Sequence, residues 1–522
     1  MSKGFDKRFD ALISADGSVL AGGLKGVEKE SLRVDANGYL SNTDHPAAFG
    51  SALTNGFITT DFSEALLEFI TPAYPGTWEA MQVLCDIHQF TYAGLGDELL
   101  WTASMPCRIP DDDEIPLARY GKSNVGQMKT IYRRGLGHRY GMRMQTIAGV
   151  HFNYSLPPQF WPTYRDVIGS DLGEDAFRSD QYLGLVRNFR RFGWLILYLF
   201  GASPAMCKSF AGDAELAMPE LSASTLYEPF GTSLRMSDLG YSNQNQSRIN
   251  ISLNSLNDYI RDLSAAIETP EPMYREIGVK VDGKYRQINA NQLQIENEYY
   301  SSVRPKRVAM SGERPTAALR RGGIEYVEIR SLDINVNDPA GINQNTMRFI
   351  EAFLIYCVIE DSPPLCEKSL DETKQNQALT AKQGRDPKFQ LHRDGTPVAL
   401  AIWAQEILDK VMGVAEAIDR QEGGRSYTEA TQLMQSLIDN PEETPSARLL
   451  DALRVEGGSF FELAMSIAKG HRDYFAAITP LSQESQAQFE QAASESIARQ
   501  LDIEASDTLS LDEYLATYFS SD

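Results

Sequence analysis

Residues 26–34 constrain the fold more than any other segment, because they place two carboxylates in a β-type pattern. Alternate side chains of a strand share a face, so Glu28 and Glu30 project together about 7 Å apart. Two like charges held this close inside a fold need a compensating cation. Carboxylate oxygens suit Mg²⁺, with Mn²⁺ as the alternative, and either ion also binds phosphate oxygens. Because the same spacing is common on exposed strand faces, a metal site and a solvated face both remain open.

Charge and hydropathy exclude two classes of function. The formal net charge of −22 would repel a phosphate backbone, so no nucleic-acid partner is expected. No run of about eighteen apolar residues occurs, so no membrane span is predicted. The N-terminal residues lack the apolar region of a secretory signal. We therefore expect a cytoplasmic protein whose scattered cysteines form no disulfide framework and stay reduced: Cys85, Cys107, Cys207, Cys357 and Cys366.

The hydrophobic pattern predicts an α+β fold with a helical C-terminal region. Strand-type runs occupy residues 26–34, 66–71, 144–156, 249–253 and 323–332, and helical spacing marks residues 77–95 and 180–198. The tail reads as amphipathic helices over residues 349–358, 398–414, 427–437, 446–453, 460–469 and 483–500. Loops are expected at residues 381–394 and 439–444. This order favours a catalytic body over residues 1–360, with a helical accessory region over residues 361–522 packed on it.

Two further strand-type runs carry polar residues of the kind that bind metals. Glu68 interrupts the apolar run 66–71, where an unpaired carboxylate is costly. His151 alternates with apolar neighbours in residues 149–155, although a lone strand histidine is more often a core residue than a ligand. A solvated face for Glu68 is as probable as a metal site. The recurrence of such residues in several strands nevertheless favours one shared polar cavity.

The strand-type run 326–333 pairs a carboxylate with a guanidinium. Glu328 and Arg330 share one face, and an arginine fork matches phosphoryl oxygens and can stabilise the charge that develops during phosphoryl transfer. An intrastrand ion pair is the ordinary alternative. The adjoining residues 304–321 carry six basic side chains, Lys306 and Arg320 among them, and a single acid, Glu313. A basic island in an acidic chain indicates a local anionic ligand, such as a nucleotide phosphate.

Two other polar segments give weaker signals. Residues 132–141 form a second basic cluster, which we expect to be a solvated loop because its glycine spacing matches no phosphate-binding loop. The sequence GxxxxGK[ST] is absent from the whole chain, so any ATP would have to be bound through metals held by carboxylates. Residues 231–241 offer Arg235 and Tyr241 in a loop that suits a small carboxylate ligand, although a surface turn is equally probable.

Long stretches of the chain resemble one enzyme family. The similarity is carried by residues 26–34, 58–72, 104–107, 149–156, 200–204, 233–241, 294–298 and 322–335. These strings resemble glutamate–cysteine ligase of the gammaproteobacterial type over nearly the whole chain, and the likeness thins in the helical tail. The resemblance implies a glutamine synthetase-like body with a curved, mainly antiparallel sheet over the active site.

The resemblance also implies a role for each of several residues. The magnesium ligands would be Glu28, Glu30, Asp61, Glu68, His151 and Glu328, and Arg330 would face the transferring phosphoryl group. The two amino acids would be bound by Tyr132, Gln145, Arg235, Tyr241 and Tyr300. Lys306 and Arg320, from the basic island, are expected to bind the nucleotide phosphates.

The implied activity is the ATP-dependent joining of the L-glutamate side-chain carboxylate to the amine of L-cysteine. It proceeds through γ-glutamyl phosphate and is the first step of glutathione biosynthesis. The protein is expected to be a monomer. A related glutamate–amine ligase with another acceptor is the nearest alternative. A more distant alternative is a non-catalytic sensor or scaffold whose metal site is structural.

Overall fold

The computed structural model describes residues 3–212, 216–239, 246, 249–310 and 312–520. In this part of the chain the main sheet has seven strands, in the order β11-β12-β5-β1-β3-β2, with β4 paired to β1. Every pairing in it is antiparallel. The strands are β1 (Leu24–Val34), β2 (Ile58–Thr60), β3 (Leu66–Ile70), β4 (Leu99–Leu100), β5 (Val150–Ser155), β11 (Val303–Lys306) and β12 (Tyr326–Leu332). The predicted α+β fold with a mainly antiparallel sheet is confirmed.

One face of this sheet is apolar and covered by helices. Val27, Phe69, Phe152 and Ile329 point to this face and are fully buried. The covering helices are α2 (Thr77–Gly94), α5 (Glu174–Phe192), α6 (Trp194–Phe200) and α11 (Gln344–Ile359). Alternation along each strand therefore sends the intervening polar side chains to the opposite face, where the candidate site lies.

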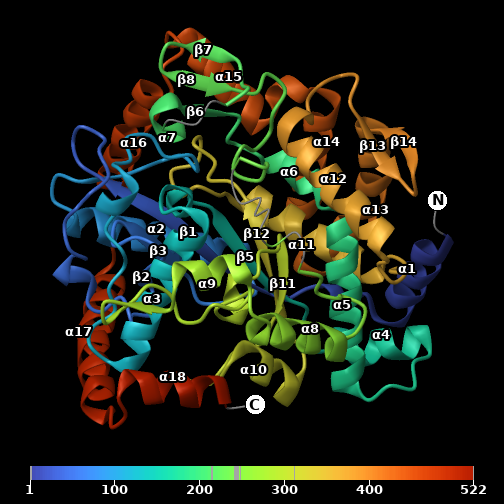
Figure 1. Ribbon diagram of the computed structural model, residues 1–522. Helices are drawn as coiled ribbons and strands as arrows, with labels where there is room; N and C mark the ends of the chain where they lie inside the picture. Colours follow the sequence, from blue (N-terminus) through green and yellow to red (C-terminus); the bar gives the residue numbers. More distant parts are fainter. Residues whose placement is uncertain (1–2, 213–215, 240–245, 247–248, 311, 521–522) are drawn as a thin grey trace.

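Further helices surround this centre (Figure 1). Those before the tail are α1 (Lys3–Asp16), α3 (Asn124–Tyr140), α4 (Phe160–Ile168), α7 (Lys208–Ala211), α8 (Leu256–Glu268), α9 (Pro272–Ile277) and α10 (Pro315–Gly322). The tail holds α12 (Glu367–Gln383), α13 (Leu400–Glu422), α14 (Ser426–Asp439), α15 (Pro445–Val455), α16 (Phe460–Ala477), α17 (Gln483–Ser506) and α18 (Leu511–Ser520). The predicted helical C-terminal region is confirmed. None of the helices among the described residues is long and apolar enough to cross a bilayer.

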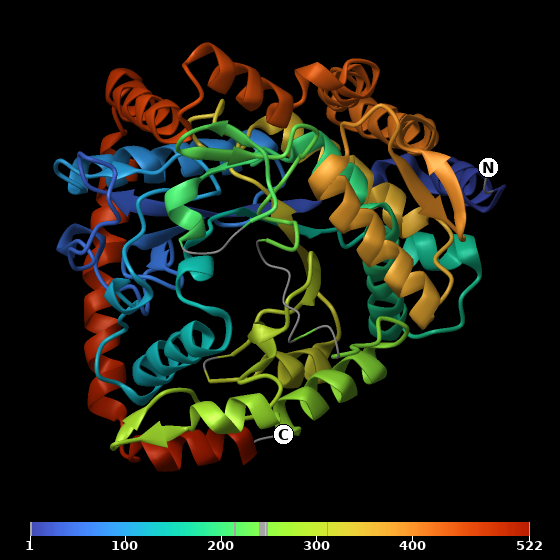
Figure 2. The same cartoon turned by 45° about the horizontal axis from the view of Figure 1, so that its top comes forward.

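The last two helices run along the outside of the molecule (Figure 2). α17 packs on α2, where Phe489 meets Phe57 and Phe90. α18 packs on α3, and its Leu515 shares a small apolar cluster with Met128 and Ile131. The tail thus contacts the helix that forms one wall of the candidate site.

Small sheets lie outside this core. They are β6 (Ala205–Cys207) with β7 (Glu220–Ser222) and β8 (Thr225–Tyr227), the hairpin β9 (Lys280–Val281) and β10 (Lys284–Tyr285), and the hairpin β13 (Gln390–Arg393) and β14 (Thr396–Ala399). The loop predicted over residues 381–394 is shorter in the structure, because α12 extends to Gln383 and β13 begins at Gln390. Asp394 and Gly395 both have positive φ, which matches the tight two-residue turn between β13 and β14.

Two of the predicted strands differ from the structure. Residues 249–253 form no strand, although Ile249 and Ile251 are buried as their alternation suggests. The Ser252 amide donates to the Asp262 carboxylate instead of to a neighbouring strand. The predicted strand over residues 144–156 is shorter, because a 3₁₀ turn, η4 (Arg143–Thr146), precedes β5.

The prediction that all the cysteines are reduced is wrong for Cys107 and Cys207. They form a disulfide, with their Cα atoms 5.2 Å apart and their positions 100 apart in sequence. Cys85, Cys357 and Cys366 are free thiols. No spacing motif marks a pair this distant, because only the folded chain brings β6 beside the loop that carries Cys107.

Removing this disulfide is expected to destabilise the protein by about 2–4 kcal/mol, because the unfolded chain regains the freedom of a long closed loop. Urea denaturation of Cys107→Ala/Cys207→Ala without reductant should show a lower midpoint than the parent protein. Cys366→Ala, which removes an exposed free thiol, is the matched control. Equal midpoints for the parent and the double variant would contradict a stabilising bond.

Candidate active site

Strand register brings most of the predicted metal-binding side chains to one face of the main sheet. Glu28 lies opposite His151 on β5, and Glu30 lies opposite Glu68 on β3. Directly opposed residues of antiparallel strands share a face, and so do residues two apart in one strand. Glu328 joins the same face through the pairing of β12 with β5. Side chains from four strands therefore converge, although they are up to 300 residues apart in sequence.

His151 lies at the centre of this group. Its Nδ1 atom is 3.1 Å from Glu28 Oε2 and 3.7 Å from Glu328 Oε1, and its Nε2 atom is 4.0 Å from Glu30 Oε1. One ligand atom from each of Glu28, Glu68 and His151 can be chosen so that all lie within 4.8 Å of one another. Such a set of oxygen and nitrogen donors could hold a divalent cation.

The carboxylates of the cluster do not share one electrostatic environment. Burial, followed by the charges of Glu28, Asp61 and Glu30, raises the pKa of Glu68 well above its ordinary value. Burial also raises the pKa of Glu30. These two carboxyl groups resist ionisation because no cation of the protein fully compensates their negative charge. Uncompensated negative charge is what a site for a bound cation requires.

Glu328 behaves in the opposite way, because two cations face it. Burial alone would raise its pKa, but the charges of Lys306 and Arg330, together with those of His151 and Arg304, hold the pKa well below its ordinary value. Arg330 Nη1 is 3.0 Å from Glu328 Oε1, and Lys306 Nζ is 3.5 Å from Glu328 Oε2. In Glu28, burial likewise opposes ionisation, but the hydrogen bond with His151 helps to leave the pKa lowered. The site thus has an acidic side and a side where positive charge faces the cavity.

These groups line a cavity of about 670 Å³ that lies between the sheet, α3 and the segments before β11. Among the predicted residues, the cavity is lined by Glu28, Glu30, Asp61, Glu68, Tyr132, Gln145, His151, Tyr300, Lys306, Glu328 and Arg330. The volume suits a ligand of nucleotide size. Asp61 follows β2, and its carboxylate is 3.6 Å from Arg133 Nη2 at the rim, so it is more exposed than the other acids.

The remaining predicted residues lie elsewhere. Arg320 is exposed on α10 and does not line the cavity. Arg235 is buried behind the cavity wall and donates to the carbonyl of Arg330 at 2.9 Å. Gly149 makes this possible, because a Cβ there would collide with the Arg235 guanidinium. Tyr241 lies outside the described residues.

Residues 132–141, predicted to be a solvated loop, belong mostly to helix α3, which forms one wall of the cavity. Ser123 caps its first turn by accepting from the Gly126 amide. Besides Tyr132, the helix contributes Lys129 and Arg133 to the cavity wall. The predictions from sequence did not include these two residues in the site. Burial lowers the pKa of Lys129 to about 8. Helical spacing, with positions 129, 132, 133 and 136 on one face, is the signal that could have found them.

Comparisons with known proteins agree with one another. The family model described as glutamate-cysteine ligase matches residues 11–380. The chain is 48% identical over 523 residues to a protein named glutamate–cysteine ligase from Alcanivorax borkumensis, covering 99% of each. It is 46% identical to a protein of the same name from Azotobacter vinelandii, covering 100% of this chain and 99% of that protein. It is also similar to the crystal structure of Francisella tularensis glutamate–cysteine ligase in complex with AMP, with a TM-score of 0.90, 34% identity, and 96% and 98% of the two chains covered.

Proposed function

This chain belongs to the glutamate–cysteine ligase family, and from that premise we propose that the acidic cavity on the main sheet is its active site. The chain is accordingly an ATP-dependent ligase that forms γ-glutamylcysteine, which in this family begins glutathione biosynthesis. One observation carries the assignment of the site. Strand register gathers Glu28, Glu68, His151 and Glu328 on a single face, beside Arg330.

The chemistry explains why a ligase needs such a cavity. A carboxylate does not react with an amine at neutral pH, because its oxygen is a poor leaving group. Transfer of the ATP γ-phosphoryl group to the glutamate side chain gives an acyl phosphate, and the cysteine amine then attacks its carbonyl carbon and releases phosphate. The first step brings an anionic nucleophile to an anionic phosphate, so its barrier is largely electrostatic.

The carboxylate cluster fits Mg²⁺, with Mn²⁺ as the alternative. Glu30 is buried and Glu68 half-buried, both close to other acids, and the raised pKa of each supports a site where the protein alone leaves their charge undercompensated. Glu28, Glu30, Glu68, His151 and Glu328 would hold the ions, with Asp61 at the rim. Bound there, the metal would supply positive charge against the triphosphate.

The cations of the protein stand where the phosphoryl group would pass. Arg330 and Lys306 flank Glu328 on one side of the cavity, and Lys129 and Arg133 approach from α3 on another. Preorganised cations stabilise charge that develops in a transition state without having to move. We assign phosphoryl stabilisation to Arg330 and nucleotide phosphate binding to Lys306. The same role predicted for Arg320 stays a prediction, and its exposed position does not support it.

The amino-acid substrates are assigned to the part of the cavity next to α3. Tyr132, Gln145 and Tyr300 line it, and offer hydroxyl and amide groups to an amino acid. Arg235 lies behind Arg330 and supports its main chain, so we propose that Arg235 positions the site in addition to its predicted substrate contact. The role of Tyr241 stays a prediction.

A product assay tests the proposed function. With ATP, Mg²⁺, glutamate and cysteine, mass spectrometry should detect γ-glutamylcysteine, with ADP and phosphate in equal amounts. Replacing cysteine by 2-aminobutyrate or by a polyamine distinguishes the related ligase with another acceptor. Faster turnover with a polyamine than with cysteine would favour that alternative. Metal-dependent melting without any ATP turnover would favour a structural metal site instead.

Glu68→Gln is expected to stabilise the metal-free protein and to weaken its stabilisation by magnesium. Because the folded pKa of Glu68 lies above its unfolded value, its charge destabilises the metal-free protein, and that penalty grows as the pH rises through the range between the two. At pH 8 the variant should therefore melt about 1–3 °C higher than the parent without metal. Millimolar Mg²⁺ should stabilise the parent much more than the variant.

Scanning fluorimetry at pH 5 and pH 8, with and without Mg²⁺, measures both effects. Glu114→Gln, which removes an exposed acid away from the cavity, is the matched control. An unchanged Mg²⁺ response in Glu68→Gln would exclude Glu68 from the metal site.

Three further expectations stay predictions. We propose that residues 1–360 form the catalytic body and that the helices of residues 361–522 brace it, which the packing of α18 on α3 supports. We also propose that the protein is a monomer and that it acts in the cytoplasm. Size-exclusion chromatography with light scattering tests the first of these two proposals.

A further inference from the structure

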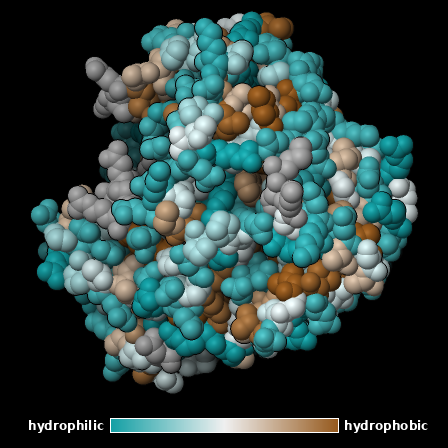
Figure 3. All heavy atoms as spheres, turned by 90° about the vertical axis from the view of Figure 1, so that its right-hand side faces the viewer, coloured by the Kyte–Doolittle hydropathy of each residue, from teal (hydrophilic) through white to brown (hydrophobic). Residues whose placement is uncertain are grey.

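A second cavity, of about 520 Å³, lies on the side of the molecule that carries α1, α12 and α13. It shares no lining residue with the cavity proposed as the active site. Hydrophilic side chains cover most of the face seen in Figure 3, and hydrophobic ones form small separate patches. Nothing in the ligase chemistry described above uses this cavity.

Aromatic rings from several helices form its walls. Phe5 and Phe9 come from α1, Phe192 from the end of α5, Tyr356 from α11 and Trp403 from α13. The ring of Phe192 lies 5.7 Å from that of Tyr356 and 6.3 Å from that of Trp403. Phe5, Tyr356 and Trp403 are buried, so the rings are held in fixed positions by the core.

These rings already hold cations of the protein against their faces. The guanidinium of Arg393 lies 5.4 Å from the centre of the Trp403 ring. The Lys410 ammonium lies 5.3 Å from the Phe5 ring and 5.7 Å from the Tyr356 ring. Such contacts arise because the face of an aromatic ring carries partial negative charge. The walls are therefore suited to positively charged groups.

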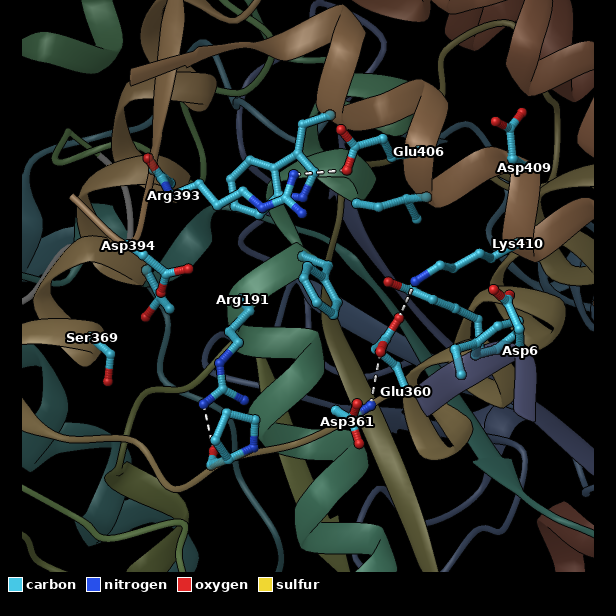
Figure 4. Close-up of a pocket in the computed structure, with 18 of the residues that line it drawn as sticks. Asp6, Arg191, Glu360, Asp361, Ser369, Arg393, Asp394, Glu406, Asp409 and Lys410 are labelled. Atoms are coloured by element: carbon cyan, nitrogen blue, oxygen red, sulfur yellow. Dashed lines mark hydrogen bonds and ion pairs between the residues drawn. The ribbon is translucent and has the colours of Figure 1, made fainter. Parts of the chain in front are cut away.

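The acids of the cavity outnumber its bases. Seven acidic and three basic residues line it. Arg393 pairs with Glu406 at 2.7 Å, and Lys410 pairs with the buried Glu360. Arg191 donates to the carbonyl of Pro363, not to a carboxylate (Figure 4).

Four of the acids have no ion-pair partner among the described residues: Asp6, Glu372, Asp394 and Asp409. Figure 4 shows Asp6 and Asp409 on the side of the cavity that carries Lys410. The excess of negative charge next to aromatic walls disfavours a phosphate or carboxylate ligand and favours a cation.

We propose that this cavity binds an organic cation, an amine carried on an apolar or aromatic body. The ring walls would take the body, and Asp6 and Asp409 would attract the amine. A volume of about 520 Å³ is enough for a ligand of drug-like size. This inference does not depend on the proposed active site, because the two cavities have separate walls.

Tryptamine is a suitable probe, and indole-3-acetate is its comparator because it carries the same ring with a negative charge. Isothermal titration at low ionic strength, with Mg²⁺ present to occupy the acidic cluster of the other cavity, should give one tryptamine site and no binding of indole-3-acetate. Asp6→Asn/Asp409→Asn should weaken tryptamine binding by about 5–10-fold, as expected for two partly exposed charges.

Asp10→Asn/Glu416→Gln is the matched control. It removes the same charge from the same two helices, α1 and α13, at exposed positions outside the cavity. Its affinity for tryptamine should stay within about 2-fold of the parent, since Asp10 and Glu416 do not line the cavity and their exposed charges are screened by solvent. No tryptamine binding at millimolar concentration, equal binding of indole-3-acetate, or equal losses in the two double variants would overturn the proposal.

Discussion

Arg330→Ala is expected to lower kcat by about 10²–10³-fold, because it removes a preorganised cation from the site of phosphoryl transfer. The Arg330 guanidinium is held 3.0 Å from Glu328 and 3.5 Å from the His151 ring, at the edge of the proposed metal cluster. The positive charge of Arg330 should act most strongly in the transition state, where negative charge develops on the transferring phosphoryl group. The KM values for glutamate and cysteine should therefore change much less than kcat.

Steady-state assays of cysteine-dependent ADP release measure this effect. Arg330→Lys keeps a positive charge but loses the planar guanidinium fork that can bind two phosphoryl oxygens. Its kcat should therefore be intermediate between those of the parent and Arg330→Ala. Arg320→Ala is the matched control, because it removes an arginine of the same basic segment that is exposed and outside the cavity. Near-normal turnover of Arg330→Ala would refute the assignment. A comparable loss in Arg320→Ala would show that the basic segment acts as a whole.

The core of the candidate site could be predicted from sequence because strand geometry is periodic. Glu28 and Glu30 must share a face in any strand, and the same holds for Glu328 and Arg330. What periodicity cannot give is the pairing of strands. The opposition of Glu28 to His151 and of Glu30 to Glu68 is a matter of register between segments far apart in the chain. The family resemblance supplied that link.

The sequence does not identify α3 as a wall of the cavity, because the local amino-acid composition suggests a loop. Residues 132–141 contain three glycines and several arginines, a composition typical of a loop. The helix forms nonetheless, because it packs on the main body and on α18, and these tertiary contacts outweigh its weak helix propensity. The helix ends at Tyr140 and is capped by Gly141, whose positive φ of 85° suits glycine.

Two other errors have a common origin in long-range structure. Residues 249–253 alternate as a strand does, yet they form no strand, and the Ser252 amide donates to the Asp262 carboxylate. The bond between Cys107 and Cys207 spans 100 residues and follows no motif. Likewise, Arg235 seemed to belong to a loop open to substrate, but folding places it beneath Arg330. In each case the outcome depends on which distant segment the topology brings beside these residues.

The strand that carries Glu28 and Glu30 is anchored from behind by a buried ion pair. Lys25 Nζ on β1 lies 2.7 Å from Glu351 Oε2 on α11, and both side chains are fully buried. The Tyr427 hydroxyl donates to the same carboxylate oxygen at 2.6 Å. Three elements thus meet at one carboxylate, on the side of the sheet away from the cavity.

Lys25→Met is expected to destabilise the protein by about 3–5 kcal/mol, because it leaves the Glu351 charge buried without its cation. The triple variant Lys25→Met/Glu351→Met/Tyr427→Phe removes the charge and its donors together, so it should be clearly more stable than the single variant. Urea denaturation midpoints at pH 7 rank the stabilities of the parent, the single variant and the triple variant. Arg454→Met, which breaks an exposed pair with Asp451, is the control and should cost less than about 1 kcal/mol.

The order of these midpoints separates two explanations for the pair. If the ion pair itself supplies stability, the triple variant should be as unstable as Lys25→Met. If the cost comes from an isolated buried charge, the triple variant should recover most of the loss. In that second case the pair serves mainly to fix β1 against α11, and catalytic rate becomes the informative readout. A stable triple variant with a reduced kcat would show that the pair holds Glu28 and Glu30 in register for the metal site.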